Sequence, residues 1–446
     1  MTPAERPRSA PEQHWLARLS FLFVGLAVAF VAVFAELKSL TMLAVGLVGA
    51  VVSLAAAYFF LSRRGVWRWL SLAVFVLTPI AVIAVFALRN LLWVAIVAAA
   101  IWLLASMTAR LALVRDHPDW RMPEHPAEPP ARHPYLIMNP KSGGGKVEKF
   151  DLKRKAEELG AEVFLIDGSE PIDVAKVARE AVAQGADLHG VAGGDGTQAL
   201  VAGIAAEHGI PFVVISAGTR NHFALDLGLN RENPSACLGA LSDGVELRVD
   251  LGRINGQVFV NNASFGAYAE VVETPAYRDD KLNTTLNLLP DLLQGQRGVR
   301  LSARADDTEI RSPQALLVAN NPYGTGDIAG LSRRARLDAG VLGVIGVKVR
   351  NVQQAIDLLR GRRAVGVRVL RTKKIEITAD APQIPVGVDG EALSMSTPVV
   401  CTISPGALRV WVPRDRPGVV PPKPPINWAR LWHLAGIHRK RAEVAA

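Results

Sequence analysis

The sequence predicts four transmembrane helices at the N-terminus, followed by a doubly wound α/β domain and a β-sandwich domain. Three observations carry this prediction. Apolar residues, which make up 50% of the chain, crowd into residues 1–114. Residues 134–248 then alternate short apolar runs with helical segments that end in glycine. Beyond residue 249, strand-like runs dominate with few long helices between them, which is typical of a sandwich.

The apolar region contains four stretches long enough to cross a membrane, which takes about 20 residues. They are residues 16–35, 39–61, 70–88 and 91–109. A cleaved signal peptide would give one shorter apolar run. A helical bundle in water would show polar residues at helical period, which these stretches barely do. We therefore expect a multi-pass anchor.

Positive charge in the short loops predicts the orientation of these spans. Arginines gather before the first span, between the second and third, and after the fourth, whereas the two alternate loops hold only Lys38 and Arg89. Both termini and the soluble part should therefore lie in the cytoplasm, at the cell membrane. No acidic or histidine residue sits mid-span, so a transport path is not expected.

Composition narrows the classes of partner. The formal charge of +9 suits an anionic membrane surface or a phosphate-rich ligand. Nucleic acid is not expected, because no basic patch interleaved with aromatic residues is present. The two cysteines, Cys237 and Cys401, form no metal-binding spacing and exclude a disulfide framework.

The soluble part begins after a proline-rich stretch, residues 115–133, which predicts a stiff linker. Strands are predicted within residues 135–140, 161–167, 188–197 and 211–218, and helices within 146–160, 171–185 and 198–209. Such repeats indicate a parallel sheet, whose binding sites lie at the carboxyl ends of its strands.

The rest of the chain divides into a sandwich, a returning strand and a tail. Residues 249–404 are assigned to the sandwich, and residues 405–413 are expected to return to the α/β domain as a strand. The basic tail, residues 414–446, contains a helix with one apolar face. This helix either lies in the membrane interface or docks on the soluble domain. The apolar face is formed by Trp428, Leu431, Trp432 and Ala435, and the charges available to headgroups are Arg430, Arg439, Lys440 and Arg441.

The first glycine-rich segment, residues 139–146, stands between a predicted strand and a predicted helix. Its glycines, beginning with Gly143, expose backbone amides to an anion, and the helix N-terminus adds a favourable field. Lys141 and Lys146 supply charge. The segment is no Walker A motif, because Val147 follows Lys146. An ordinary glycine turn is the alternative to phosphate contact.

The second segment is the pentapeptide Gly193–Thr197, which ends a predicted strand. Gly193, Gly194 and Gly196 let the backbone approach a phosphate closely. Asp195 is held where a Mg²⁺ ion would bridge it to that phosphate, and Thr197 can donate at the start of the next helix. A tight turn with a helix cap is the plainer interpretation.

The third and fourth segments complete the candidate site. Thr219 and Asn221, in the segment 216–221 that contains Gly218, offer a hydroxyl and an amide to nucleotide or phosphate. Arg220 is either a charge clamp or a solvated arginine. In the turn 388–391, Glu391 is the candidate general base for the proton of an attacking hydroxyl.

Together, these four segments resemble the diacylglycerol kinase catalytic family, which includes bacterial lipid kinases and the sphingosine and ceramide kinases. The resemblance covers roughly residues 134–413 and rests on NPxSG, GGDGT, GTxN followed by FA, and a late DGE. It implies a nucleotide cleft between an α/β domain and a β-sandwich. It also implies ATP as donor, Mg²⁺ as cofactor and a lipid hydroxyl, diacylglycerol-like, as acceptor.

The resemblance also implies roles for single residues. Asn139 and Ser142 would belong to the first phosphate loop, and Asp195 and Thr197 would lie at nucleotide and metal. Asp250 looks like the aspartate that opens the family's second domain, and Glu391 like its general base. Two departures stand out. His222 replaces an aspartate that often follows GTxN, and Ala339 replaces the second aspartate of LDDG, so a second metal site is not expected.

Two other functions are compatible with the same motifs. The GGDGT loop is shared with NAD kinases, although an anchor in the membrane suits a soluble substrate poorly. A catalytically inactive, lipid-sensing regulator should have lost Asp195 or the glycines, and both are intact. The lipid acceptor and the oligomeric state, including a homodimer, stay open.

Overall fold

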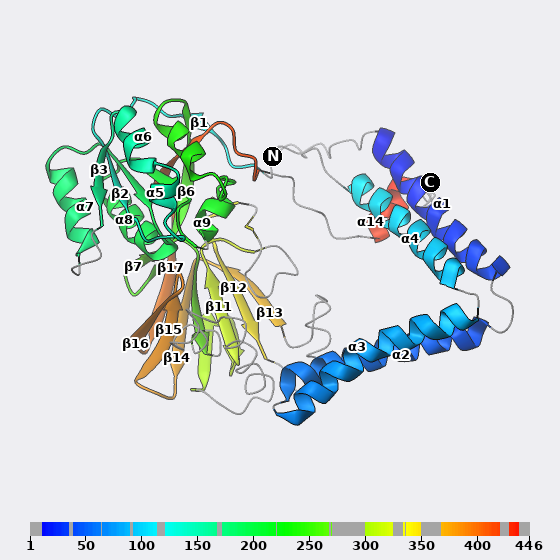
Figure 1. The fold of residues 1–446 in the computed structure, drawn as a ribbon. Coiled ribbons are helices and arrows are strands. Elements are labelled where there is room, and N and C mark those ends of the chain that lie inside the picture. The colour runs from blue at the N-terminus through cyan, green and yellow to red at the C-terminus, as the bar shows by residue number, and fades with distance from the viewer. Residues whose placement is uncertain are drawn as a thin grey trace, which may run out of the picture. The chain divides into compact units, whose positions relative to one another are not determined.

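The computed structural model contains two compact units. The helical unit comprises residues 1–118 and 421–446, and the sheet unit comprises residues 119–420 (Figure 1). The residues that the structure describes are 11–34, 39–63, 65–89, 92–113, 121–166, 172–219, 221–266, 269, 299–323, 333–334, 336–348, 367–419 and 428–436.

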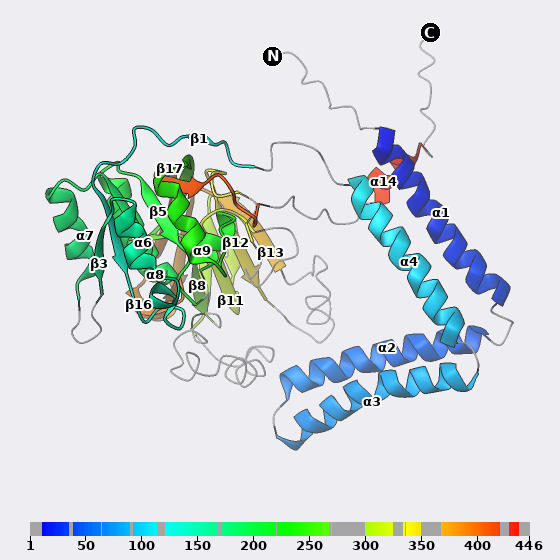
Figure 2. The same ribbon diagram turned by 45° about the horizontal axis from the view of Figure 1, so that its top comes forward.

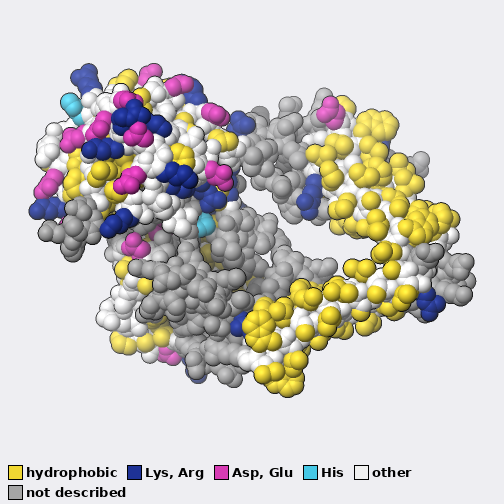
Figure 3. Space-filling model, in the orientation of Figure 1, with side chains coloured by type: hydrophobic (Ala, Val, Ile, Leu, Met, Phe, Trp, Pro, Cys, Tyr) yellow, Lys and Arg dark blue, Asp and Glu magenta, His cyan; other side chains and the backbone are white. Residues whose placement is uncertain are grey.

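The helical unit contains the apolar helices that the sequence predicts. They are α1 (Pro11–Phe34), α2 (Ser39–Ser62), α3 (Val66–Leu88) and α4 (Leu92–Leu113). In the described residues, α1, α3 and α4 are long and apolar enough to cross a membrane, and α2 has an apolar core at Ala44–Phe60. Hydrophobic side chains cover the visible surface of these helices (Figure 3). A surface of this kind is stable in lipid rather than in water.

The helices pack in pairs, α1 along α4 and α2 along α3 (Figures 1 and 2). Helix α1 begins at Pro11, five residues before the expected span at residue 16. A proline is tolerated in the first turn of a helix, and an acidic residue there, Glu12, favours the helix dipole.

A short helix from the tail, α14 (Trp428–Ala435), packs against α1 and α4. Leu431 and Leu434 join a buried cluster with alanines of those helices. The ring of Trp432 lies 4.8 Å from that of Phe21. The sequence left open a helix in the membrane interface or one docked on the soluble domain. The structure instead docks its apolar face within the helical unit. Arg439, Lys440 and Arg441 lie outside the described residues.

The α/β part of the sheet unit has four parallel strands in the order β3-β2-β4-β5. They are β2 (Pro134–Met138), β3 (Glu162–Leu165), β4 (Leu188–Ala192) and β5 (Phe212–Ile215). The helices that follow or flank them are α5 (Lys146–Lys149), α6 (Leu152–Glu158), α7 (Val174–Ala183), α8 (Asp195–Glu207), α9 (His222–Asp226) and the 3-10 helix η2 (Pro234–Leu241). This arrangement confirms the predicted doubly wound architecture.

Two local features differ from the sequence-based expectation. The helix expected over 146–160 is divided at Asp151, whose backbone is left-handed with φ 53°. The amine of Lys155 donates to the freed carbonyl of Phe150, which stabilises the break. Helix α8 begins at Asp195 rather than after Thr197, so the GGDGT loop itself forms its first turn.

The sandwich consists of two sheets joined to the α/β sheet by two long strands. Strand β6 (Gly244–Ile254) pairs antiparallel with β17 (Val399–Pro413), and the register shifts between Ser404 and Leu408. Beyond β6 and β17, the first sheet adds β7 (Gln257–Phe259), β9 (Leu301–Ala305), β10 (Thr308–Arg311) and β14 (Lys374–Ala379). The second has the order β13 (Val367–Thr372), β12 (Leu342–Val347), β11 (Ala315–Ala319), β8 (Asn262–Gly266), β15 (Gln383–Val388), β16 (Glu391–Ser396).

Strands β6 and β17 run through residues 249 and 405, where the sequence suggested domain boundaries. The C-terminal half of β17 pairs in parallel with β5 at Val410 and Trp411. The two domains therefore share one continuous sheet.

The segments that enter and leave the sheet unit are fastened to it and to each other. Strand β1 (His125–Pro126) pairs with β6, and Glu124 forms an ion pair with Arg416. The amide of Gly418 donates to the carbonyl of Gly228 at 2.9 Å. From residue 121 onward, the proline-rich stretch therefore lies on the sheet unit.

Candidate active site

Three loops at the carboxyl ends of β2, β4 and β5 pack backbone against backbone. Gly143 has φ 58°, and a Cβ atom there would collide with the carbonyl oxygen of Ala217. A Cβ atom on Gly218 would lie 2.6 Å from the carbonyl oxygen of Gly193. Only glycine permits such close approach, so these residues bring the first, second and third segments together.

The first loop is ordered by Asn139. Its amide donates to the carbonyl of Ala192 at 2.9 Å, and its side-chain oxygen accepts from the amide of Lys141 at 3.0 Å. Consecutive left-handed glycines then follow Ser142, a conformation in which successive amides form an anion-binding concavity. The amine of Lys146 donates to the carbonyl of Arg231 at 2.7 Å, so this lysine already has a partner inside the protein.

Asp195 connects the second loop to the third. Its carboxylate accepts the amides of His222 at 3.1 Å and Phe223 at 3.2 Å, which are the first amides of α9. Asp195 as a whole is 8% exposed. Asp195 therefore caps α9 while it begins α8, and its position relative to the third loop is fixed from both sides.

A buried glutamine that the sequence did not single out supports the same loops. The side-chain amide of Gln198 donates to the carbonyl of Gly193 at 3.1 Å and to the side-chain oxygen of Asn221 at 3.3 Å. Asn221 in turn donates to the carbonyl of Gly218 at 3.0 Å. Gln198 follows the GGDGT loop directly, so only its position next to that motif hinted at this role. Arg220 lies outside the described residues.

The DGE turn reaches the loops from the sandwich. Asp389, with φ 49°, accepts three backbone amides, those of Val260, Asn261 and Asn262, at 2.8, 2.8 and 3.1 Å. Burial raises the pKa of Asp389 to about 7, the three amides oppose the rise, and the charge of Asp195 adds to it.

Glu391 follows this turn and touches the first turn of helix α8. A Cβ atom on Gly196 would overlap the Glu391 carboxylate. Glu391 itself is exposed. The candidate base, which belongs to the sandwich, therefore contacts the residue next to Asp195 in the α/β domain.

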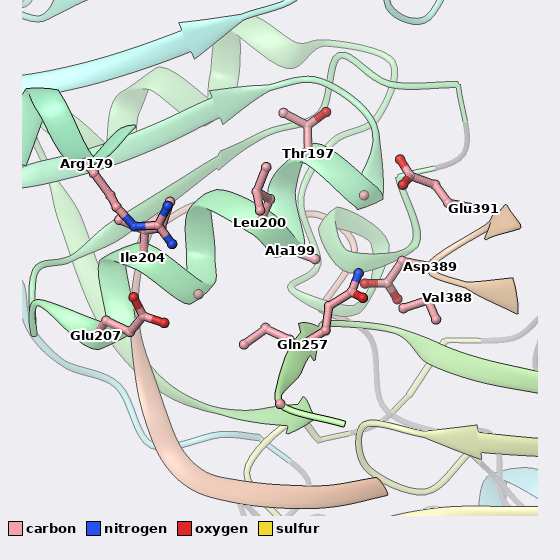
Figure 4. Close-up of a pocket in the computed structure, with 14 residues that line it drawn as sticks. Arg179, Thr197, Ala199, Leu200, Ile204, Glu207, Gln257, Val388, Asp389 and Glu391 are labelled. Carbon is pink, nitrogen blue, oxygen red and sulfur yellow. The ribbon is translucent and has the colours of Figure 1, made fainter. Parts of the chain in front are cut away.

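A pocket of about 330 Å³ lies between α8 and the sandwich. Thr197 and Glu391 stand at one end, and Arg179 and Glu207 at the other (Figure 4). The predicted residues that line it are Gly196, Thr197 and Glu391, whereas Asn139, Lys141, Ser142, Gly143, Gly193, Gly194, Asp195, Gly218, Thr219 and Asn221 do not. The apolar lining comes from Ala199, Leu200, Ile204, Val258 and Val388.

Asp250 and the two residues that depart from the family pattern, Ala339 and His222, each take part in a hydrogen bond inside the sheet unit. Asp250 accepts the amides of Gly340 and Gly406, at 2.6 and 2.7 Å, so it joins two chain segments inside the sheet unit. The amide of Ala339 donates to the side-chain oxygen of Asn321 at 2.7 Å. His222 contributes its backbone amide to Asp195.

The residues at the GGDGT loop fit a Mg²⁺ ion that is shared with a triphosphate. Such an ion is held by one or two carboxylates, with phosphate oxygens and waters completing its shell. Asp195 supplies one carboxylate there. Asp389 is a second carboxyl group nearby, close enough for the charge of Asp195 to raise its pKa. In the part of the chain that the structure describes, no group of three His, Cys, Asp or Glu residues could hold a metal by itself.

Comparisons with known proteins match this architecture. The model of the diacylglycerol kinase catalytic domain matches residues 133–254, and that of the YegS C-terminal NAD kinase beta sandwich-like domain matches residues 267–412. A diacylglycerol kinase of Bacillus subtilis is 28% identical over 272 residues, 57% of this chain and 88% of that protein. A probable lipid kinase, YegS-like, of Pseudomonas aeruginosa is 29% identical over 294 residues, 63% and 95% of the two chains.

Solved structures show the same fold. The crystal structure of a diacylglycerol kinase from Bacillus anthracis has a TM-score of 0.52 and 22% identity, and the match covers 66% of this chain and all of that one (100%). The two adjacent family models, the curated relatives and the shared fold agree with each other. Both domains of the sheet unit are therefore similar to those of the diacylglycerol kinase family, and this chain is an ATP-dependent lipid kinase.

Proposed function

We propose that this protein transfers the γ-phosphate of ATP to the hydroxyl group of a diacylglycerol-like lipid, at the cytoplasmic face of a membrane that its N-terminal helices enter. The observation that carries the proposal is the contact between the Glu391 carboxylate and Gly196. This contact supports the proposal because Glu391, as a general base, would then stand beside the loop that would hold the phosphates.

The phosphates would bind where the three glycine loops meet. The left-handed glycines after Ser142 and the N-terminus of α8 offer backbone amides and a favourable field to an anion. Lys141 adds a positive charge, and Thr197 and Thr219 offer hydroxyl groups on the same loops. Asn221 would act by ordering these loops, because its side chain is buried and bonded to Gln198 and Gly218. These residues would position the triphosphate without reacting themselves, as phosphoryl transfer requires.

Glu391 would accept the proton of the lipid hydroxyl while its oxygen attacks the γ-phosphorus. The bond between that phosphorus and the bridging oxygen of ADP breaks, and the products are ADP and a lipid phosphomonoester. Mg²⁺ bound at Asp195 would neutralise charge on the phosphate oxygens. Asp195 and Glu391 face this reaction from different domains, so its geometry depends on how the two domains are joined.

The pocket along α8 would hold the nucleoside of ATP. Its 330 Å³ lie at the lower end of the usual size for a small-molecule site. Leu200 and Ile204 offer an apolar side for a base, and Arg179 and Glu207 offer hydrogen-bonding groups at its far end (Figure 4). Gln257 of β7 adds a side-chain amide to the lining. Thr197 and Glu391 would mark the end that meets the phosphates.

Anchoring in the membrane would give the enzyme access to an acceptor that is nearly absent from water. A tethered enzyme meets a membrane substrate at a high effective concentration. The apolar helices α1, α3 and α4 support this role. The arginines before the first span, between the second and third, and after the fourth favour a cytoplasmic sheet unit.

The test measures transfer of ³²P from γ-labelled ATP by the purified full chain in mixed micelles. Diacylglycerol should be labelled, and triacylglycerol, which has no free hydroxyl, should not. Asp195→Asn and Glu391→Gln should each lose at least about 100-fold in kcat. Label that appears in NAD but in no lipid would establish the NAD kinase alternative. ATP binding without transfer to either acceptor would indicate a regulator.

A further inference from the structure

A fully buried arginine joins the two domains behind the candidate active site. Arg334 is 0% exposed and pairs with Asp226 of α9, with its Nε donating to the carboxylate at 2.7 Å. Its Nη1 donates to the carbonyl oxygens of Val260 at 3.0 Å, Asn261 at 3.1 Å and Asn320. Its Nη2 donates to the side-chain oxygen of Asn261 at 2.9 Å.

The charge of Arg334 is maintained in this buried setting. Burial lowers the pKa of its guanidinium, but the Asp226 carboxylate and Tyr323 outweigh burial and raise it. The guanidinium is a planar fork whose donors have fixed directions. A residue of this kind fixes the orientation of every group that it binds, here one carboxylate from the α/β domain and, from the sandwich, three backbone carbonyls and one side-chain amide.

The segment that Arg334 binds is held from its other side by the DGE turn. Arg334 takes the carbonyls of Val260 and Asn261, and Asp389 takes the amides of Val260, Asn261 and Asn262. Residues 260–262 are therefore fixed between a buried cation and a partly buried carboxyl group. Asp389 stands two residues before Glu391, so the position of the candidate base follows the position of this segment.

These contacts form a closed circuit through both domains. Asp226 ends the helix α9 whose first amides bind Asp195. Asp195 is followed by Gly196, which meets the Glu391 carboxylate. From Asp195 the circuit thus runs through α9, Asp226, Arg334, segment 260–262 and Asp389 to Glu391, and it closes at Gly196.

We propose that Arg334 is a positioning residue for phosphoryl transfer, which through this circuit sets the placement of Glu391 opposite Asp195. The inference rests on the proposed role of Glu391 as general base. It also explains how the chain tolerates His222. The family often carries a carboxylate at that position, and here a carboxylate stands one helical turn later, on the same face of α9, at Asp226.

The test is a double-mutant cycle of Arg334→Lys and Glu391→Gln in the full chain. Lysine keeps the charge beside Asp226 but loses the fork. We expect kcat to fall about 100-fold, as misplacement of a catalytic group does, while the KM for ATP changes less than about threefold. In the Glu391→Gln background, Arg334→Lys should cause no further loss, because both act through one group.

The matched control is Arg414→Lys, in the exposed ion pair with Asp243 on the same unit. It should leave kcat and KM unchanged. A second variant, Asn261→Ala, removes one acceptor of the fork and keeps the ion pair. It should lower kcat severalfold at constant KM, and it provides the measurement if Arg334→Lys does not fold.

Each result separates the inference from the function on which it rests. If Glu391→Gln is inactive while Arg334→Lys keeps the wild-type kcat, the inference alone is overturned. Where Arg334→Lys does not fold, a wild-type kcat in Asn261→Ala has the same meaning. Losses that multiply in the cycle would also overturn it, because Arg334 would then act on another step. Wild-type kcat in Glu391→Gln overturns the proposed base and this inference together.

Discussion

The carboxylate of Glu391 lies against the α-carbon of Gly196, the residue that follows Asp195 in the first turn of α8. Glu391 belongs to the sandwich and Gly196 to the α/β domain. The contact leaves no room for a side chain on the helix at this point. The proposed base and the proposed metal-binding loop are thus in contact through a glycine.

Substituting Gly196 with alanine tests this contact. The added methyl group would overlap the Glu391 carboxylate and displace it. We expect kcat for lipid phosphorylation to fall about 100-fold, with little change in thermal stability, because Glu391 is exposed and can move. The control is Gly239→Ala in η2, where the new Cβ would lie 3.6 Å from Pro413, an ordinary contact. Equal kcat in both variants would show that Glu391 does not act from this position.

Leu200 tests the assignment of the pocket. It is 44% exposed and lines the middle of the groove, away from Glu391. Leu200→Trp should fill the pocket and raise the KM for ATP about tenfold, while the KM for lipid stays constant. Steady-state kinetics with each substrate varied in turn measures both. Val369→Trp is the control, since Val369 is exposed on β13 outside the pocket. A rise confined to the lipid KM would assign the pocket to the acceptor instead.

Asp389 predicts a dependence of stability on pH. Its pKa is raised by burial from 3.8 to about 7, so the folded state holds a proton that the unfolded state has already lost. The stability that this proton contributes is present at acid pH and is lost as the pH rises through about 7. The melting temperature of the wild type should therefore fall, relative to Asp389→Asn, between about pH 4 and pH 7, and the difference should be constant above that range. Parallel curves would mean that Asp389 is ionised throughout.

Leu431 tests the docking of the tail helix. Its side chain is 0% exposed in the cluster shared with α1 and α4. Leu431→Asp would bury an unpaired charge, so α14 should detach. Limited proteolysis of the full chain in micelles would then remove the tail faster than in the wild type. Ala429→Asp changes the exposed side of the same helix and should not alter the rate. Equal protection of all three proteins would contradict the docked arrangement.

Much of the fold follows from local sequence pattern. The apolar helices, the parallel strands and the glycine loops at strand ends were predicted because each depends on residues close together in the chain. The loops meet in the structure since carboxyl ends of neighbouring parallel strands share one edge. The break at Asp151 was missed because Ser235 of η2, which lies 85 residues away in the chain, donates to the freed carbonyl of Phe150.

The circuit behind the site could not be predicted in this way. Asp226 and Arg334 are 108 residues apart, and each alone looks like an ordinary surface charge. Their burial depends on how α9 meets the sandwich, which no local pattern encodes. The docking of α14 against α1 and α4 was not predicted from the sequence for a different reason. One apolar face suits a membrane interface and a helix pair equally well, so only the three-dimensional packing distinguishes them.

The place of α14 in the helical unit has a consequence for biosynthesis. Helices α1 and α4 leave the ribosome long before α14, and the whole sheet unit is made between them. The apolar cluster around Ala17, Ala109 and Leu113 therefore stays incomplete until Leu431 and Leu434 have been translated. A chain that stops early would keep this apolar surface open, in the state that quality-control proteases recognise. Helix α14 thus completes the packing of α1 and α4 only after the whole sheet unit has been synthesised.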